Sequence, residues 1–215
     1  ISNSEFGIGR YSGTGNRIVH PGDVTFQNCR FHIDGESSEE ASKWAAIHVY
    51  WNLSQGEDVN QSLKLLDCDF EVGPGVAKQD TRIIYCEGDL AERKNRLLVE
   101  GGRISSTFNY GVFINQGGTV ALRGVEIEAQ TPMHFGSADK WVIDALIDGV
   151  QVEEASRYAM IVTHGTNNRF THRNVEIDES VNTIETRYGI TQNQYRGRRT
   201  ILGTTPPTSA THGLL

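Results

Sequence analysis

The chain has 215 residues, of which 37% are apolar and 22% charged, and this composition describes one folded domain rather than a disordered protein. Its longest uncharged apolar runs, such as Tyr158–Val162, fall far short of the roughly 20 residues that cross a bilayer, so we expect no membrane insertion. The net charge of −7 argues against a nucleic-acid partner, because phosphate attraction would work against the protein's own charge.

Three cysteines, Cys29, Cys68 and Cys86, are too few for a disulfide-stapled scaffold and lack the spacing of a zinc finger. We therefore expect small, buried thiols. The chain opens at Ile1 without an initiator methionine, a basic segment or an apolar leader. We interpret it as a piece of a longer protein, truncated at its N-terminal end.

One unit recurs along the chain, centred on a turn-forming residue with an apolar residue three places later. In chain order the centres are Asn3, Asn28, Asp67, Gly101, Gly124, Gly149 and Asn174. The apolar residues at +3 are Phe6, Phe31, Phe70, Ile104, Ile127, Val152 and Ile177, and the intervening +2 residues are Glu5, Arg30, Asp69, Arg103, Glu126, Gln151 and Glu176. This alternation of inward and outward residues predicts a strand after each centre.

A second strand precedes each centre, because positions −4 and −2 are also mostly apolar, as in Val24/Phe26 and Leu97/Val99. Between −2 and +1 the inward phase slips by one residue, which a continuous strand cannot do. The centre must therefore be a sharp bend with a left-handed backbone, the conformation that Asn, Asp and Gly tolerate best.

A third apolar stretch lies between successive centres, at residues 46–51, 82–87, 111–116, 133–135, 158–163 and 183–188. Only residues 36–44 suggest a helix. Three short strands per unit, at spacings of 25, 39, 34, 23, 25 and 25 residues, predict an all-β fold: a right-handed single-stranded parallel β-helix of six to seven coils. We expect it over residues 1–181, with residues 182–215 as a C-terminal extension.

The inward phase of the third strand stays open at this point, because either Phe113 and Asn115 or Val112 and Ile114 could face the core. If the first pair does, Asn115 and Thr163 share the position of Cys86 and His134 and form a polar interior ladder.

The stretch Val24–Phe31 and its echo Leu63–Phe70 resemble the pectate-lyase-like superfamily of right-handed β-helices. The end, Thr204–His212, is similar to the Pro-Thr-Ser-Gly-Thr stretch that often follows the β-helix in phage tailspike-like proteins, with Ala210 in place of the usual glycine. These resemblances imply a tailspike or tail-fibre fragment that binds bacterial surface polysaccharide, assembles as a homotrimer, and resides in the virion or outside the cell. A non-catalytic shaft and a secreted polysaccharide lyase or epimerase are the alternatives.

Stacked coils place equivalent side chains about 4.8 Å apart, which suits an extended polymer. In the superfamily the substrate usually lies over the third-type strand, and that position holds many aromatic and charged residues here. Aromatic rings stack on sugars, and cations pair with acidic sugar groups. The predicted substrate-binding residues are Trp44, His48, Tyr50, Trp51, Arg82 and Tyr85.

Glu87 and Asp89 are the predicted catalytic pair, since glycoside hydrolysis needs two carboxylates. The competing interpretation is that they are solvated turn acids around Gly88. A lyase would instead use a base such as Arg82, Arg93 or Lys94. No metal-binding or phosphate-binding motif occurs, so we expect neither a metal nor another cofactor.

The histidines have two interpretations each. His134 and His164 precede glycines at the end of third-type strands and could contact sugar or act as a base; the alternative is that they are surface or stack-end histidines. His172 replaces an apolar residue and is expected in the core. The segment after Asn182 carries Arg187, Arg196, Arg198 and Arg199, which could pair with Glu126, Glu128, Glu176 and Asp178 of a neighbouring subunit or simply be solvated.

Overall fold

The computed structural model describes residues 1–8, 16–19, 22–33, 45–51, 61–72, 82–88, 95–115, 117–136, 142–153, 158–163, 168–178, 182–187 and 194–202. These residues form 18 strands, joined into one sheet that winds around the molecule, and over these ranges there is no helix. Accordingly, no segment of the described chain is a helix long and apolar enough to cross a membrane. The helix expected over residues 36–44 lies outside the described residues.

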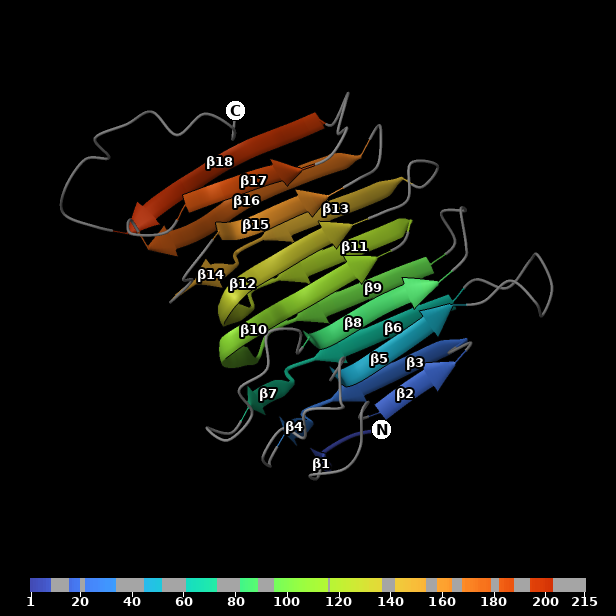
Figure 1. Ribbon diagram of the computed structural model, residues 1–215. Coiled ribbons are helices and arrows are strands. Elements are labelled where there is room, and N and C mark those ends of the chain that lie inside the picture. The colour runs from blue at the N-terminus through green and yellow to red at the C-terminus, as the bar shows by residue number, and fades with distance from the viewer. Residues whose placement is uncertain are drawn as a thin grey trace.

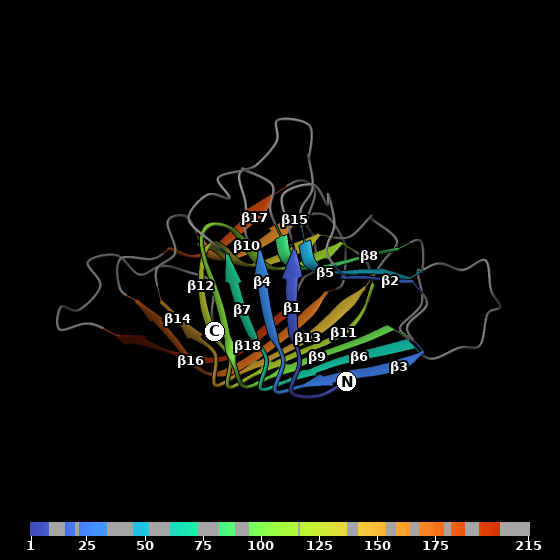
Figure 2. The ribbon, with the colours of Figure 1, turned by 90° about the horizontal axis from the view of Figure 1, so that it is seen from below.

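The strands wind as a right-handed parallel β-helix with three faces, as the sequence predicted. Figure 1 shows the strands stacked from the N-terminal to the C-terminal end, and Figure 2 shows the faces enclosing the interior. Face A, before each bend, contains β3 (Asp23–Gln27), β6 (Gln61–Leu66), β9 (Asn95–Glu100), β11 (Gly118–Arg123), β13 (Ile143–Asp148) and the first parts of β16 (Arg169–Asp178) and β18 (Gln194–Leu202).

Face B follows each bend. It contains β1 (Glu5–Ile8), β4 (Arg30–Ile33), β7 (Asp69–Val72), the first parts of β10 (Arg103–Asn115) and β12 (Glu126–Gly136), β14 (Gln151–Val152) and the second parts of β16 and β18.

Face C closes each coil. It contains β2 (Asn16–Val19), β5 (Ala45–Trp51), β8 (Arg82–Gly88), the second parts of β10 and β12, β15 (Tyr158–Thr163) and β17 (Asn182–Arg187). Apart from β2, which was not predicted, these strands correspond to the predicted third-type strands.

The bends between faces A and B are the predicted repeat centres. All seven have a left-handed backbone: φ is 50° at Asn3, 52° at Asn28, 50° at Asp67, 69° at Gly101, 56° at Gly124, 65° at Gly149 and 49° at Asn174. Around Asn28 the buried residues are Phe26, Cys29 and Phe31, so the inward phase slips across the bend as expected. The bend therefore lets two adjoining strands bury residues of opposite parity.

The core is a column of stacked apolar side chains. The ring of Phe31 stacks on Phe6 at 4.8 Å and on Phe70 at 4.7 Å between centroids, because residues at +3 are partners in the parallel ladder. The three cysteines are free and buried, as predicted. His172 is also buried, at 3% exposure, and is the ladder partner of Ile147, which confirms its core position.

On face C the inward pair is Val112 and Ile114, which are 0% and 1% exposed, whereas Asn115 is exposed. The ladder pairs Asn115 with Glu87 and Gly136, not with Cys86 and His134. The conditional expectation of a polar interior ladder through Asn115 was therefore wrong. Distance to the next glycine is a poor guide to register, because it depends on where each strand ends.

The parallel ladder continues past residue 181. Strand β17 pairs with β15, and β18 pairs with β16 as far as Leu202. The division of the chain into a β-helix and an extension stays a prediction, but parallel strand pairing is found on both sides of its proposed boundary.

Candidate functional site

Four of the predicted site residues come together on the outside of face C. His48 lies on β5, and Arg82, Tyr85 and Glu87 lie on β8, the next strand of the stack. The backbone of Tyr50 and Trp51 belongs to β5, while their side chains fall outside the described part of the structure, as do Trp44 and Asp89 entirely.

Glu87 is the centre of this cluster. Its Oε1 lies 2.8 Å from Nε2 of His48, and its Oε2 accepts a hydrogen bond from the hydroxyl of Tyr85. Tyr85 and Glu87 share a side of β8 because they are two residues apart, and His48 is the direct ladder partner of Tyr85. The side chain of Glu87 is 26% exposed, against 8% for His48. Solvent therefore reaches the carboxylate, whose orientation is held from two sides.

Ring contacts hold the groups around Glu87 in place. The rings of His48 and Tyr85 stack with centroids 4.9 Å apart. The guanidinium carbon of Arg82 lies 4.4 Å from the ring centroids of both Tyr85 and Phe113. A cation this close to two aromatic faces is attracted by both ring quadrupoles. Arg82 is thus clamped at the start of β8, and its side chain covers two rings of the outer surface.

Tyr85 keeps its proton at neutral pH. Burial raises the pKa of Tyr85, because the phenolate would lose hydration. The hydrogen bond to Glu87 and the negative charge of Glu87 raise this pKa further, whereas Arg82 and a hydrogen bond from Asn115 lower it. The hydroxyl group therefore serves as a donor to Glu87 and as an acceptor from Asn115. This places Asn115, Tyr85, Glu87 and His48 in one connected network.

Sequence reasoning missed part of this surface. Phe113 and His134 continue the row of His48 and Tyr85 in ladder register, with their rings 4.1 Å apart, and Tyr110 contacts both. His134 was considered as a base or sugar contact, and the structure places it 9% exposed in this row. Its predicted counterpart His164 lies outside the described residues. Assigning the outward phase to Phe113 would have revealed the row.

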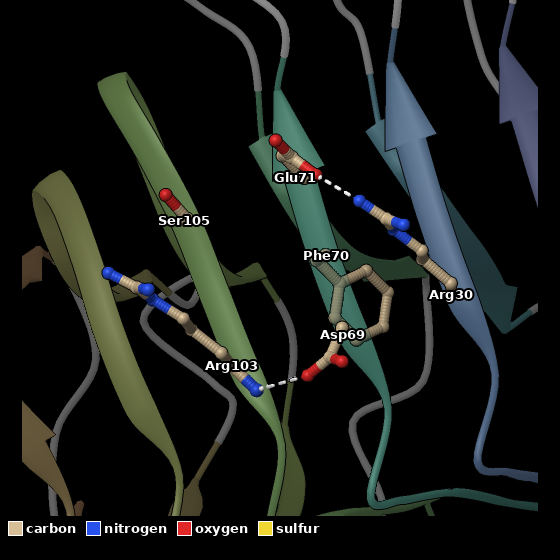
Figure 3. A pocket seen from close by; sticks show the side chains of 6 residues that line it. All are labelled: Arg30, Asp69, Phe70, Glu71, Arg103 and Ser105. Atoms are coloured by element: carbon tan, nitrogen blue, oxygen red, sulfur yellow. Dashed lines mark hydrogen bonds and ion pairs between the residues drawn. The ribbon is translucent and has the colours of Figure 1, made fainter.

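A hollow of about 320 Å³ opens on the outside of face B. Figure 3 shows the residues that line it: Arg30, Asp69, Phe70, Glu71, Arg103 and Ser105. Arg30 contributes Nη2 to an ion pair with Oε2 of Glu71 at 2.8 Å, and the backbone N–H of Arg103 donates to Asp69 across 3.1 Å. The sequence did show alternating charge among the +2 residues Arg30, Asp69 and Arg103, and this alternation was the signal by which the hollow could have been found.

Among the described side chains, no group of three or more His, Cys, Asp or Glu residues could hold a metal ion. Comparison with known proteins finds no matching family model, no similar curated protein and no similar solved structure. The function must therefore be argued from the residues and their geometry.

Proposed function

We propose that the chain is a fragment of a phage tailspike-like protein of the pectate-lyase-like superfamily, and that it binds and cleaves a bacterial surface polysaccharide across face C. The observation that carries the proposal is the solvent-accessible Glu87, held by His48 and Tyr85 beside an aromatic row. The sequence resemblances support the tailspike origin, the extracellular or virion location and the homotrimer.

The surface around Glu87 supports glycan recognition in two ways. Phe113 is half-buried and Asn115 exposed on the same strand, so an aromatic edge and an amide lie within one coil of the carboxylate. Sugars combine apolar C–H faces with hydroxyl groups, and such a mixed surface matches both. Arg82 adds a positive charge beside them.

We assign Glu87 the role of base and Asp89 the role of acid in hydrolysis. Oε2 of Glu87 already accepts a hydrogen bond from Tyr85, and Oε1 contacts His48, so the surroundings of Glu87 suit a proton acceptor better than a proton donor. Glu87 takes a proton from water while the water oxygen bonds to the anomeric carbon. The glycosidic carbon–oxygen bond breaks, and a carboxylic acid, for which Asp89 is the candidate, donates a proton to the leaving oxygen. Tyr85 and His48 are positioning residues in this scheme, because they act through Glu87.

The test is incubation with a panel of bacterial capsular and lipopolysaccharide glycans, with product size followed by mass spectrometry. Glu87→Gln and Asp89→Asn are compared with Glu100→Gln, a matched change at an exposed glutamate at the end of β9 on face A. We expect oligosaccharides from the wild type and Glu100→Gln, and a loss of rate of about 10²–10⁴-fold in either of the other variants. Intact polymer with the wild type would contradict the cleavage step.

A non-catalytic shaft is the second candidate function. The observation that favours it is the burial of most of the outer row: His48, Tyr85 and His134 are 6%, 3% and 9% exposed. A covered aromatic layer can stabilise the stack without touching a ligand. Under this alternative the wild type leaves every polymer intact, and Glu87→Gln lowers stability without altering glycan binding.

A further inference from the structure

The hollow on face B arises from differences in side-chain length within the ladder. Two columns of outward residues run along the stack, and in them Asp69 lies between the longer Arg30 and Arg103, while Ser105 lies beside Glu71. The short residues leave space beside the long ones: Figure 3 shows Arg30 turned toward Glu71, and the guanidinium of Arg103 turned away from Asp69. Its size, about 320 Å³, is at the lower end of the roughly 300–1,000 Å³ found for ligand pockets, so it suits one small unit of a larger ligand.

Contacts beside the hollow fix the orientation of its rim. Arg103 pairs through Nε with Glu126 at 2.8 Å and through Nη2 with Glu128 at 3.0 Å. The hydroxyl of Ser105 donates to Glu128 across 2.9 Å. A rim that is ordered before binding loses less conformational freedom when a ligand arrives. The ion pairs are exposed and individually weak, but together they position donors and acceptors around one space.

The rim offers both hydrogen-bond donors and hydrogen-bond acceptors. Arg30 uses Nη2 on Glu71, and Arg103 uses Nε and Nη2 on glutamates of the next coils. Each guanidinium has five N–H groups in all, more than these ion pairs use, and Asp69 and Glu71 supply carboxylate oxygens. Arg30 and Arg103 remain 59% and 49% exposed, and Glu71 is 55% exposed, so a ligand can reach them. An anion would match only the arginines, and a cation only the acids. A hydroxyl group both donates and accepts, so a polyol matches the whole rim.

Charge on the rest of face B selects against an acidic ligand. The hollow itself is balanced, with two arginines and two acids, but the neighbouring coils present Glu126, Glu128 and Glu153, all sharing Arg103. Burial and the negative charges of Glu153 and Glu128 raise the pKa of Glu126, whereas Arg103 acts in the opposite direction. A chain of uronic or sialic acids running along this face would be repelled by the same negative charges.

From the hollow between Arg30 and Arg103 and the amphoteric chemistry of its rim, we propose a second saccharide subsite on face B, which takes a neutral, hydroxyl-rich sugar unit. The inference rests on the proposed function in that the ligand is part of a surface polysaccharide. It is independent of the Glu87 cluster, which lies on face C.

The experiment measures binding to immobilised bacterial O-antigen and capsular polysaccharides, half of them neutral and half carrying uronic or sialic acids. Ser105→Gln fills the hollow from an outward strand position. Thr119→Gln is the matched control, because Thr119 is an exposed, outward residue of β11 on face A. We expect the wild type and Thr119→Gln to bind neutral polymers alike, and Ser105→Gln to bind them about tenfold more weakly, corresponding to one lost rim contact.

A second variant, Arg30→Gln, removes a rim donor without filling the space and should also weaken binding, which keeps the test valid if Ser105→Gln does not fold. Equal binding by wild type, Ser105→Gln and Arg30→Gln would overturn the subsite, and so would binding of acidic polymers alone. The proposed function on face C would survive both results. No binding by the wild type would remove both proposals. A change of sedimentation mass in Ser105→Gln would reassign the hollow to an interface between copies and overturn the subsite.

Discussion

Alanine substitutions at Gly102 and Gly124 separate two destabilising effects that glycine avoids at a bend of this β-helix: a left-handed backbone and steric crowding of the Cβ atom. Gly102 and Gly124 both have a left-handed backbone, with φ of 74° and 56°. A Cβ at Gly102 would lie 2.1 Å from the carbonyl oxygen of Cys68 and 2.7 Å from its backbone carbon and nitrogen, whereas a Cβ at Gly124 would meet nothing within 4 Å. The first position is crowded by backbone of the preceding coil, and the second is open.

The expected magnitudes follow from this difference. Alanine in the left-handed region costs about 1–2 kcal/mol, and this applies to both variants. Crowding against backbone that cannot rotate away adds about 1–3 kcal/mol or more at Gly102 alone. The gain from a stiffer unfolded chain is the same for both glycine-to-alanine changes and cancels in the comparison. Gly102→Ala should therefore lower the free energy of unfolding by at least about 1–3 kcal/mol more than Gly124→Ala.

Urea unfolding followed by far-UV circular dichroism measures both losses. Gly124→Asn is a useful third variant, because Asn28 and Asn174 occupy the equivalent bend with φ of 52° and 49°, and asparagine tolerates this conformation better than alanine. We expect it to be the least harmful of the three. Equal losses for Gly102→Ala and Gly124→Ala would refute the reasoning, since the two sites would then not differ in backbone crowding.

Two further predictions concern the core and the Glu87 cluster. Phe31→Ala should lower the free energy of unfolding by about 3–5 kcal/mol, because Phe31 is 0% exposed and stacks on the rings of Phe6 and Phe70. Phe6→Ala should lower it less, since Phe6 is only partly buried. Equal losses in urea unfolding would contradict a closed aromatic column. The pKa of Tyr85 is raised by burial and by Glu87, so as pH rises the unfolded chain releases the Tyr85 proton before the folded protein does. The free energy of unfolding therefore falls above about pH 10, by up to about 1.4 kcal/mol per pH unit. Urea unfolding between pH 8 and pH 11 should show a smaller alkaline loss for Tyr85→Phe than for the wild type, and parallel pH curves would argue against a buried, protonated Tyr85.

The bends and the strands beside them could be predicted from the sequence because their causes are local. A left-handed residue at Asn28 or Gly124 is a property of that residue and its neighbours, and alternation on either side shows which residues face the core. All seven predicted centres have the expected backbone. The three-strand coil then follows from counting apolar stretches between bends.

The inward phase of face C could not be predicted in this way. Five consecutive residues of β5, Ala45–Val49, are all buried, so the outward side of the strand is covered as well and the apolar residues no longer alternate. The same holds for Ile83–Cys86 on β8. A strand that is covered on both sides carries no period of two in its hydrophobicity, and only the structure shows that Val112 and Ile114 face the core.

The sequence by itself determined the repeat, the position of every bend and the residue types available on each face. Only the tertiary structure decided which of those residues meet. His48 and Glu87 are 39 residues apart and come within 2.8 Å because two coils stack in one particular register, and the hollow between Arg30 and Arg103 exists because shorter side chains stack between longer ones. On face C this register is a long-range property, because the apolar residues there do not alternate and only the pairing of whole strands in the parallel ladder sets it.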